Sequence, residues 1–156
     1  MILKDGQLQM EDNDFYNLDE TLSEIIINSL KEFKERCNSF PSEFAKPTKE
    51  FPNGTIPTEE AHAAWLSTID EMIFGFSFDD DENIERTVNG IECPYDYSSP
   101  DWVDENRVFK PVIKPGFTEE DCQAYIEARN ISDADHENRK FKGRTLFAKY
   151  FNHLWE

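Results

Sequence analysis

The residues best suited to metal chemistry are four consecutive acids at positions 79–82. A calcium-binding loop needs oxygen ligands at alternate positions, and Asp79, Asp81 and Asn83 have that spacing. The same loop needs glycine at its sixth position and glutamate at its twelfth, where this chain has Ile84 and Gly90. We therefore interpret the run as a solvated acidic turn and predict no resident metal or other cofactor. A looser Mg²⁺ or Ca²⁺ site is the alternative.

The three histidines and three cysteines form no recognisable catalytic or zinc-binding pattern. The sequence contains no HExxH, HxH or CxxC motif, no GxSxG nucleophile elbow and no glycine-rich phosphate loop. Cys37 and Cys122 lie on apolar faces of predicted helices, where thiols are usually buried as small apolar groups. These observations predict a protein that is not an enzyme.

Net charge is the strongest compositional signal, because the chain has 33 acidic and 16 basic residues and therefore a net charge of −17. Residues 70–105 hold twelve acids and one base, Arg86, whereas residues 139–149 are basic. Such a charge repels phosphate backbones and anionic lipids and attracts basic proteins, so we expect no direct binding to nucleic acid or membranes. The sequence shows no signal-peptide pattern and no apolar run long enough for a membrane span, which predicts a cytoplasmic protein.

The acidic stretch also contains aromatic residues, and the two together suit a basic protein groove. The acids would steer association and the aromatics would anchor it, as in inhibitors that mimic DNA. The predicted partner-binding residues are Asp79, Asp80, Asp81, Glu82, Tyr95, Tyr97, Asp101, Trp102, Asp104 and Glu105. The alternative is that the acids only keep the chain soluble.

A second hypothesis uses the basic segment as an anion site. Four cations there are candidate ligands for a nucleotide signal that the protein would sequester, with nearby aromatics stacking on the base. These residues are Arg139, Lys140, Lys142 and Arg144. A small virion or assembly protein is a third possibility, and the sequence leaves the oligomeric state open.

Hydrophobic periodicity predicts the elements that position these residues. Apolar residues recur every three or four positions in helices expected at residues 19–37, 58–76, 118–130 and 135–154. We predict a mainly α, compact four-helix-type domain over residues 1–156. It would have an acidic lead at 1–17 and an acidic, irregular insert rich in proline and aromatics at 79–116. Asn89-Gly90 within the insert is typical of a small β-hairpin turn, and Thr118 is the predicted N-cap of the third helix.

Three segments, in order, resemble a known group of proteins. They are the amphipathic run 22–33, the helix 58–76 with its Trp65, and the closing segment Leu-Phe-Ala-Lys-Tyr-Phe-x-x-Leu-Trp at 146–155. Together they resemble a family of small, acidic, largely uncharacterised proteins of tailed bacteriophages. The resemblance implies a helical fold and a non-enzymatic binding protein in the cytoplasm of the infected host. Such a protein would inhibit or redirect a host protein involved in defence or nucleic-acid handling.

Overall fold

A computed structural model describes residues 2–4, 7–9, 17–45, 49, 59–78, 85–102 and 110–154. The chain divides into two compact units. Unit 1 comprises Met1–Phe78 and Asn138–Glu156, and unit 2 comprises Asp79–Glu137. The single domain predicted over residues 1–156 stays a prediction.

Within the acidic lead, two short strands pair in a way that the sequence analysis did not anticipate. β1 (Ile2–Lys4) and β2 (Gln7–Gln9) are antiparallel, with Leu3 opposite Leu8. Asp5 and Gly6 stand between the strands in the sequence, a dipeptide typical of two-residue hairpins.

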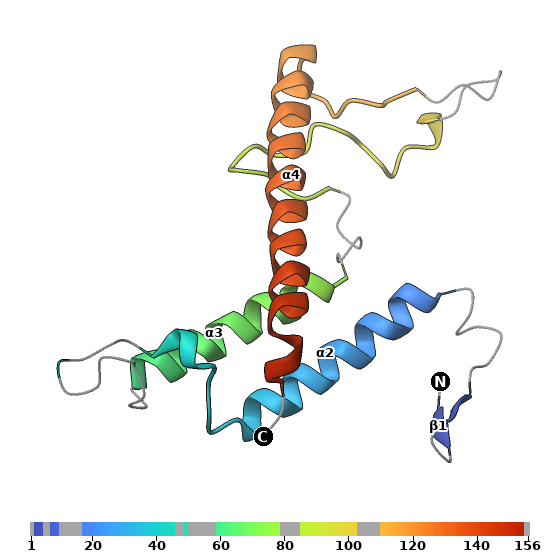
Figure 1. The fold of residues 1–156 in the computed structure, drawn as a ribbon. Helices are drawn as coiled ribbons and strands as arrows, with labels where there is room; N and C mark the ends of the chain where they lie inside the picture. Colours follow the sequence, from blue (N-terminus) through green and yellow to red (C-terminus); the bar gives the residue numbers. More distant parts are fainter. Residues whose placement is uncertain are drawn as a thin grey trace. The chain divides into compact units, whose positions relative to one another are not determined.

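Helix α2 (Leu18–Arg36) lies within one residue of the helix predicted at 19–37 (Figure 1). Its first turn carries Asp19 and Glu20 and its last turn Lys34 and Arg36, the arrangement that the helix dipole favours. The helix ends at Cys37, whose backbone N–H donates to the Phe33 carbonyl at 2.8 Å. Lys34 also donates to Asp70 of α3 at 2.6 Å, which ties the two packed helices together.

Helix α3 (Glu59–Phe76) confirms the predicted core helix and supplies half of the buried residues in the core of unit 1. Its buried face is the one expected from the spacing, and it packs against α2, the short helix η1 (Ser42–Phe44) and the end of the chain. The buried residues of this core are Leu30, Cys37, Trp65, Ile69, Met72 and Tyr150. Phe40 and Phe44 of the proline-rich connection also pack on this core.

Two glycines allow the backbones of α3 and α4 to touch within unit 1. A Cβ built on Gly143 would lie 2.7 Å from the Cα of Gly75 and would overlap the carbonyl oxygen of Glu71. A Cβ on Gly75 would lie 2.6 Å from the backbone nitrogen of Arg144. Both positions therefore require glycine for close approach, in the middle of helices where glycine is otherwise unfavourable.

The two helices predicted at 118–130 and 135–154 are one helix, α4 (Glu119–Tyr150), followed by the short helix η3 (Phe151–His153). The sequence between them, Ile-Ser-Asp-Ala, lacks glycine and proline, and its polar residues each cost well under 1 kcal/mol in a helix interior. Arg129 and Asp133 form an i,i+4 ion pair across the predicted break. The continuing backbone hydrogen bonds of the helix thus outweigh a weak local preference for a turn.

The start of α4 confirms the predicted cap. The Thr118 hydroxyl accepts from the backbone N–H of Asp121 at 3.2 Å, and the Asp121 carboxylate accepts from the backbone N–H of Thr118 at 2.7 Å. This reciprocal pair is a capping box with aspartate in place of glutamate. Its hydrogen bonds to Thr118 hold the pKa of Asp121 below the ordinary value.

Unit 2 has a small core of its own, built from irregular segments and the first half of α4. Its buried residues are Val88, Cys93, Tyr125 and Ala128. Val88 and Ile91 exchange both backbone hydrogen bonds, at 2.9 and 2.8 Å, around Asn89 and Gly90. Both turn residues have positive φ, which is the type I′ geometry expected of Asn-Gly. The described residues add only one bridge there, so a β-hairpin stays a prediction.

The structure confirms the mainly helical class with an irregular insert. Apart from the helix η2 (Pro100–Trp102) and bridges at Val88–Ile91 and Tyr95–Ile113, the described part of the insert before α4 has no regular structure. The predicted acidic, irregular character of this segment follows from its prolines and scattered acids.

Candidate protein-binding surface

The structure describes four of the ten predicted partner-binding residues. Asp79, Asp80, Asp81, Glu82, Asp104 and Glu105 lie outside the described residues. Tyr95, Tyr97, Asp101 and Trp102 are described, and all four belong to unit 2.

The three predicted aromatic anchors form one cluster with the buried Tyr125. Tyr97 and Trp102 stack at 4.7 Å with an interplanar angle of 11°. Tyr95 contacts both of them and Tyr125, each at 6.2 Å between ring centroids. The indole N–H of Trp102 donates to the Asp96 carbonyl. Tyr95, Tyr97 and Trp102 are half-buried, so they hold unit 2 together while presenting part of their surface to solvent.

Three carboxylates are placed beside this cluster, and their charges are compensated to different degrees. Glu85 accepts from Lys114 at 2.8 Å and from the backbone N–H of Tyr97 at 3.3 Å. Asp96 accepts from the Ser98 hydroxyl at 2.6 Å, a neutral partner that lowers the pKa of Asp96 and keeps it ionised. Asp101 is exposed. We call these three acids with Tyr95, Tyr97 and Trp102 the acid–aromatic surface.

Tyr125 anchors the cluster from α4 and gives unit 2 a measurable alkaline transition. The side chain is 1% exposed, its hydroxyl donates to the Arg86 carbonyl at 3.0 Å, and burial raises its pKa to about 12. The folded state thus favours the neutral phenol of Tyr125 over the phenolate. This preference contributes fully to the free energy of unfolding below about pH 10, the pKa in the unfolded chain. The contribution is lost as the pH rises to about 12. We expect Tyr125 to ionise late in an ultraviolet absorbance titration, with loss of tertiary structure, and burial raises the pKa of Tyr95 in the same direction.

The control for this titration is Tyr125→Phe, which should remove the late step that coincides with the loss of tertiary structure. A difference between the two titrations that falls near pH 10, with the native circular dichroism spectrum retained, would contradict the assignment.

Negative charge is concentrated in unit 2. This unit has 17 acidic and five basic residues, whereas the larger unit 1 has 16 acidic and 11 basic residues. Among the described residues of unit 2, ion pairs with Lys114, Arg86 and Arg129 compensate Glu85 and Asp133. Unit 2 therefore carries most of the net charge of the chain in little more than a third of its length.

The basic cluster proposed as an anion site lies in unit 1, where Arg139 is already engaged. Its guanidinium donates to both carboxylate oxygens of Glu71, at 2.9 and 3.3 Å, and lies over the Phe74 ring at 3.8 Å from the centroid. The hydrogen bond from Arg139 holds the pKa of Glu71 below its ordinary value. An anion at Arg139 would have to displace this carboxylate.

The other three cations of the cluster differ in their contacts and in their exposure. Arg144 donates from Nε to the carbonyl of Gly75 at 2.7 Å, where it satisfies an acceptor near the end of α3. Lys140 is only 5% exposed, and Lys142, two positions further along α4, is exposed. Arg139 and Arg144 are therefore each engaged within unit 1, and an anion site shared by the four cations stays a prediction.

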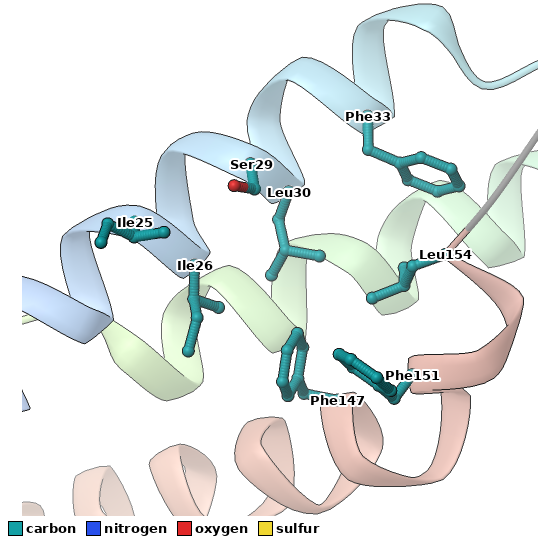
Figure 2. Close-up of a pocket in the computed structure, with 8 residues that line it drawn as sticks. All are labelled: Ile25, Ile26, Ser29, Leu30, Phe33, Phe147, Phe151 and Leu154. Carbon is teal, nitrogen blue, oxygen red and sulfur yellow. The ribbon is translucent and has the colours of Figure 1, made fainter. Parts of the chain in front are cut away.

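An apolar groove in unit 1 was not predicted from the sequence. It has a volume of about 270 Å³ and lies between α2 and the segment that follows Gly143. Figure 2 shows the side chains of α2 and those of the chain end pointing toward one another across it. Its lining residues are Ile25, Ile26, Ser29, Leu30, Phe33, Phe147, Phe151 and Leu154. The available signal was the width of the apolar face of α2, which exceeds what one neighbouring helix covers.

In the described part of the chain, no group of three or more His, Cys, Asp or Glu side chains is arranged to hold a metal ion. None of the described helices combines the length and apolar character that a bilayer span requires. Comparisons with protein-family models, with curated proteins and with solved structures find no match for this chain.

Proposed function

We propose that this chain is a non-enzymatic binding protein that occupies a basic surface of another protein. The partner is a host protein that handles nucleic acid or acts in defence, and the chain is a phage product acting in the cytoplasm of the infected cell. The contact surface is the acid–aromatic surface of unit 2 together with the acids at 79–82, 104 and 105, which flank its residues in the sequence. Its carboxylates take the place of the phosphates of the nucleic acid that the partner normally binds.

The concentration of negative charge in unit 2 is the observation that carries this proposal. A solubilising surface needs a modest excess of charge of one sign, and an even distribution over the chain serves that purpose best. Here 17 acids stand against five bases within 59 residues. A compact unit with such an imbalance costs free energy through self-repulsion, which a basic partner would relieve.

The aromatic cluster supports the proposal because it supplies anchors whose conformations are already ordered. Tyr97 and Trp102 are held by stacking and by the hydrogen bond to the Asp96 carbonyl, so binding would immobilise few additional side chains. Their half-buried rings would contribute contact area at the centre, and Asp96 and Asp101 would contribute charge around it. The acids would act mainly on the association rate and on the salt dependence.

The test is affinity capture from host lysate at low and high salt, followed by binding measurements with the purified captured partner. One variant neutralises the run at 79–82 with Asn and Gln, and another changes Asp101→Asn and Asp104→Asn. We expect roughly a tenfold or larger loss of affinity at low salt for the first variant, with a flatter salt dependence.

The matched control is Glu35→Gln with Glu59→Gln, which removes two exposed charges from unit 1. It should bind as the unchanged chain does. Retained affinity in both unit 2 variants, an equal loss in the control, or the absence of a salt-sensitive partner would each overturn the proposal.

A further inference from the structure

The tight turn at Asn89 and Gly90 of unit 2 places a side-chain amide beside a backbone N–H. Both residues are exposed, and both have positive φ, 51° and 82°, as a type I′ turn requires. Val88 and Ile91 close the turn with two backbone hydrogen bonds. Within the described residues, neither the carbonyl of Asn89 nor the N–H of Gly90 makes a hydrogen bond. The peptide group between these two residues is therefore held less firmly than the ends of the turn.

This arrangement permits an intramolecular reaction of the Asn89 side chain. The backbone nitrogen of Gly90 loses its proton and attacks Cγ of Asn89, ammonia leaves, and a five-membered cyclic imide forms. The ring closes only when this nitrogen and Cβ of Asn89 lie on the same side of the Cα–C bond, with ψ of Asn89 at about −120°, the value of a type II′ turn. The observed type I′ turn must therefore change into a type II′ turn before the reaction.

The structure allows this change of turn. Rotation of the peptide group between Asn89 and Gly90 converts one type into the other and reverses the sign of φ at Gly90, and glycine adopts both signs readily. A Cβ built on Gly90 would meet no described atom within 4 Å, so the space around the turn is open. Both types are two-residue connections, so the hydrogen bonds between Val88 and Ile91 can persist.

Asparagines inside the helices lack these conditions although they are exposed. Asn28 lies within α2, and Asn130 and Asn138 lie within α4. The N–H that follows each of them is in a helical hydrogen bond, and the following residue carries a side chain that shields the nitrogen. Among the described asparagines, Asn89 alone precedes a glycine.

We propose that Asn89 is a site of spontaneous deamidation in the folded chain and that the reaction destabilises unit 2. Water opens the imide at one of its two carbonyls. Opening at Cγ gives aspartate with the normal backbone, and opening at the main-chain carbonyl gives isoaspartate, whose backbone runs through Cβ. In sum, asparagine and water give an acid and ammonia, and no oxidant is needed. This covalent change is independent of the function proposed above.

Isoaspartate would disturb unit 2 because it adds one main-chain atom between Val88 and Ile91. Val88 is 3% exposed, and Ile91 packs against the same small core. A longer connection cannot keep both side chains in place and both hydrogen bonds of the turn. Tyr95 and Tyr97 pack on this core as well, so the acid–aromatic surface should lose its order together with the turn.

The test is incubation of the full folded chain at mildly alkaline pH, followed by peptide mapping with mass spectrometry and enzymatic detection of isoaspartate. We expect modification at Asn89 to exceed that at Asn28 and Asn138 by an order of magnitude or more, because only Asn89 precedes an unshielded amide. The mapping separates Asn89 from the Asn-Gly pair at 53–54, which lies outside the described residues. Modification of Asn89 in urea but not in the folded chain would overturn the proposal, because the fold would then protect the site.

The matched control is Asn89→Gly, which removes the reactive amide and keeps a dipeptide suited to a type I′ turn. Hydrogen exchange should show loss of protection at Val88 and Ile91 in proportion to the isoaspartate formed, with α3 unchanged. The control should keep its protection through the same incubation, and so should freshly prepared Asn89→Asp, which adds the charge without lengthening the backbone. Equal loss in either variant, or full protection in a chain that contains isoaspartate, would contradict the proposed effect on unit 2.

Discussion

Gly143→Ala should destabilise the protein by about 3 kcal/mol, although the same change in an exposed helix stabilises it by about 1 kcal/mol. The new methyl group would meet the carbonyl oxygen of Glu71 and the Cα of Gly75. Both obstacles are backbone atoms, so a side-chain rotation cannot relieve the overlap and α3 and α4 must move apart at their crossing. We expect a clear fall in the midpoint of urea unfolding followed by circular dichroism.

Gly75→Ala should have an effect of similar size, because its methyl group would meet the backbone of Gly143 and Arg144 from the other side. The matched control is Asn138→Ala, an exposed position on the same helix, where the change should stay within about 0.5 kcal/mol. A Gly143→Ala protein as stable as the unchanged chain would show that the two backbones are not in contact.

The second large effect is expected for Trp65→Ala, at about 3–5 kcal/mol of lost stability. Trp65 is 1% exposed and meets Tyr150 edge-on at 5.3 Å and Phe44 at 5.4 Å. Phe44 and Tyr150 are also in contact, at 5.5 Å, so Trp65 is one member of a three-ring cluster. Removal of the indole would leave a cavity lined by Phe44, which η1 holds in place, and by Tyr150, which the end of α4 holds in place. Urea unfolding measures the loss.

Trp65→Phe is the appropriate comparison, since it keeps an aromatic ring and much of the apolar area and should cost considerably less. Trp102→Ala provides a further contrast, because Trp102 is half-buried and belongs to the small cluster of unit 2. A cost below about 1 kcal/mol for Trp65→Ala would contradict the central place of this ring in the core.

Several parts of the fold could be predicted because their causes are local. The spacing of Leu30 in α2 and of Trp65 in α3 identified the faces that become the core. Thr118 was recognisable as an N-cap, and Asn89-Gly90 as a tight turn, because each depends on residues only a few positions away. The break expected near residue 133 was wrong because local turn propensity is a weak signal inside a long helix.

The candidate sites were harder to predict because they depend on contacts between distant segments. Arg139 and Glu71 are 68 positions apart, and no local pattern indicates that the Arg139 guanidinium donates hydrogen bonds to the Glu71 carboxylate. Tyr97 and Trp102 could be identified as aromatic residues of the acidic insert, but not as a stacked pair that Tyr95 connects to a buried Tyr125. The apolar groove requires α2 and Phe151 to face each other, which nothing near either segment specifies.

The sequence by itself thus determined the mainly helical class, the buried faces of the helices and the excess of negative charge. Periodicity, capping and composition are short-range or additive properties, so they can be read without knowing how the segments meet. The tertiary structure alone decided that Gly143 is a point of backbone contact, that Arg139 is paired, and that an apolar groove lies beside α2. Each of these depends on which surfaces pack together, and close packing is a property of the assembled chain.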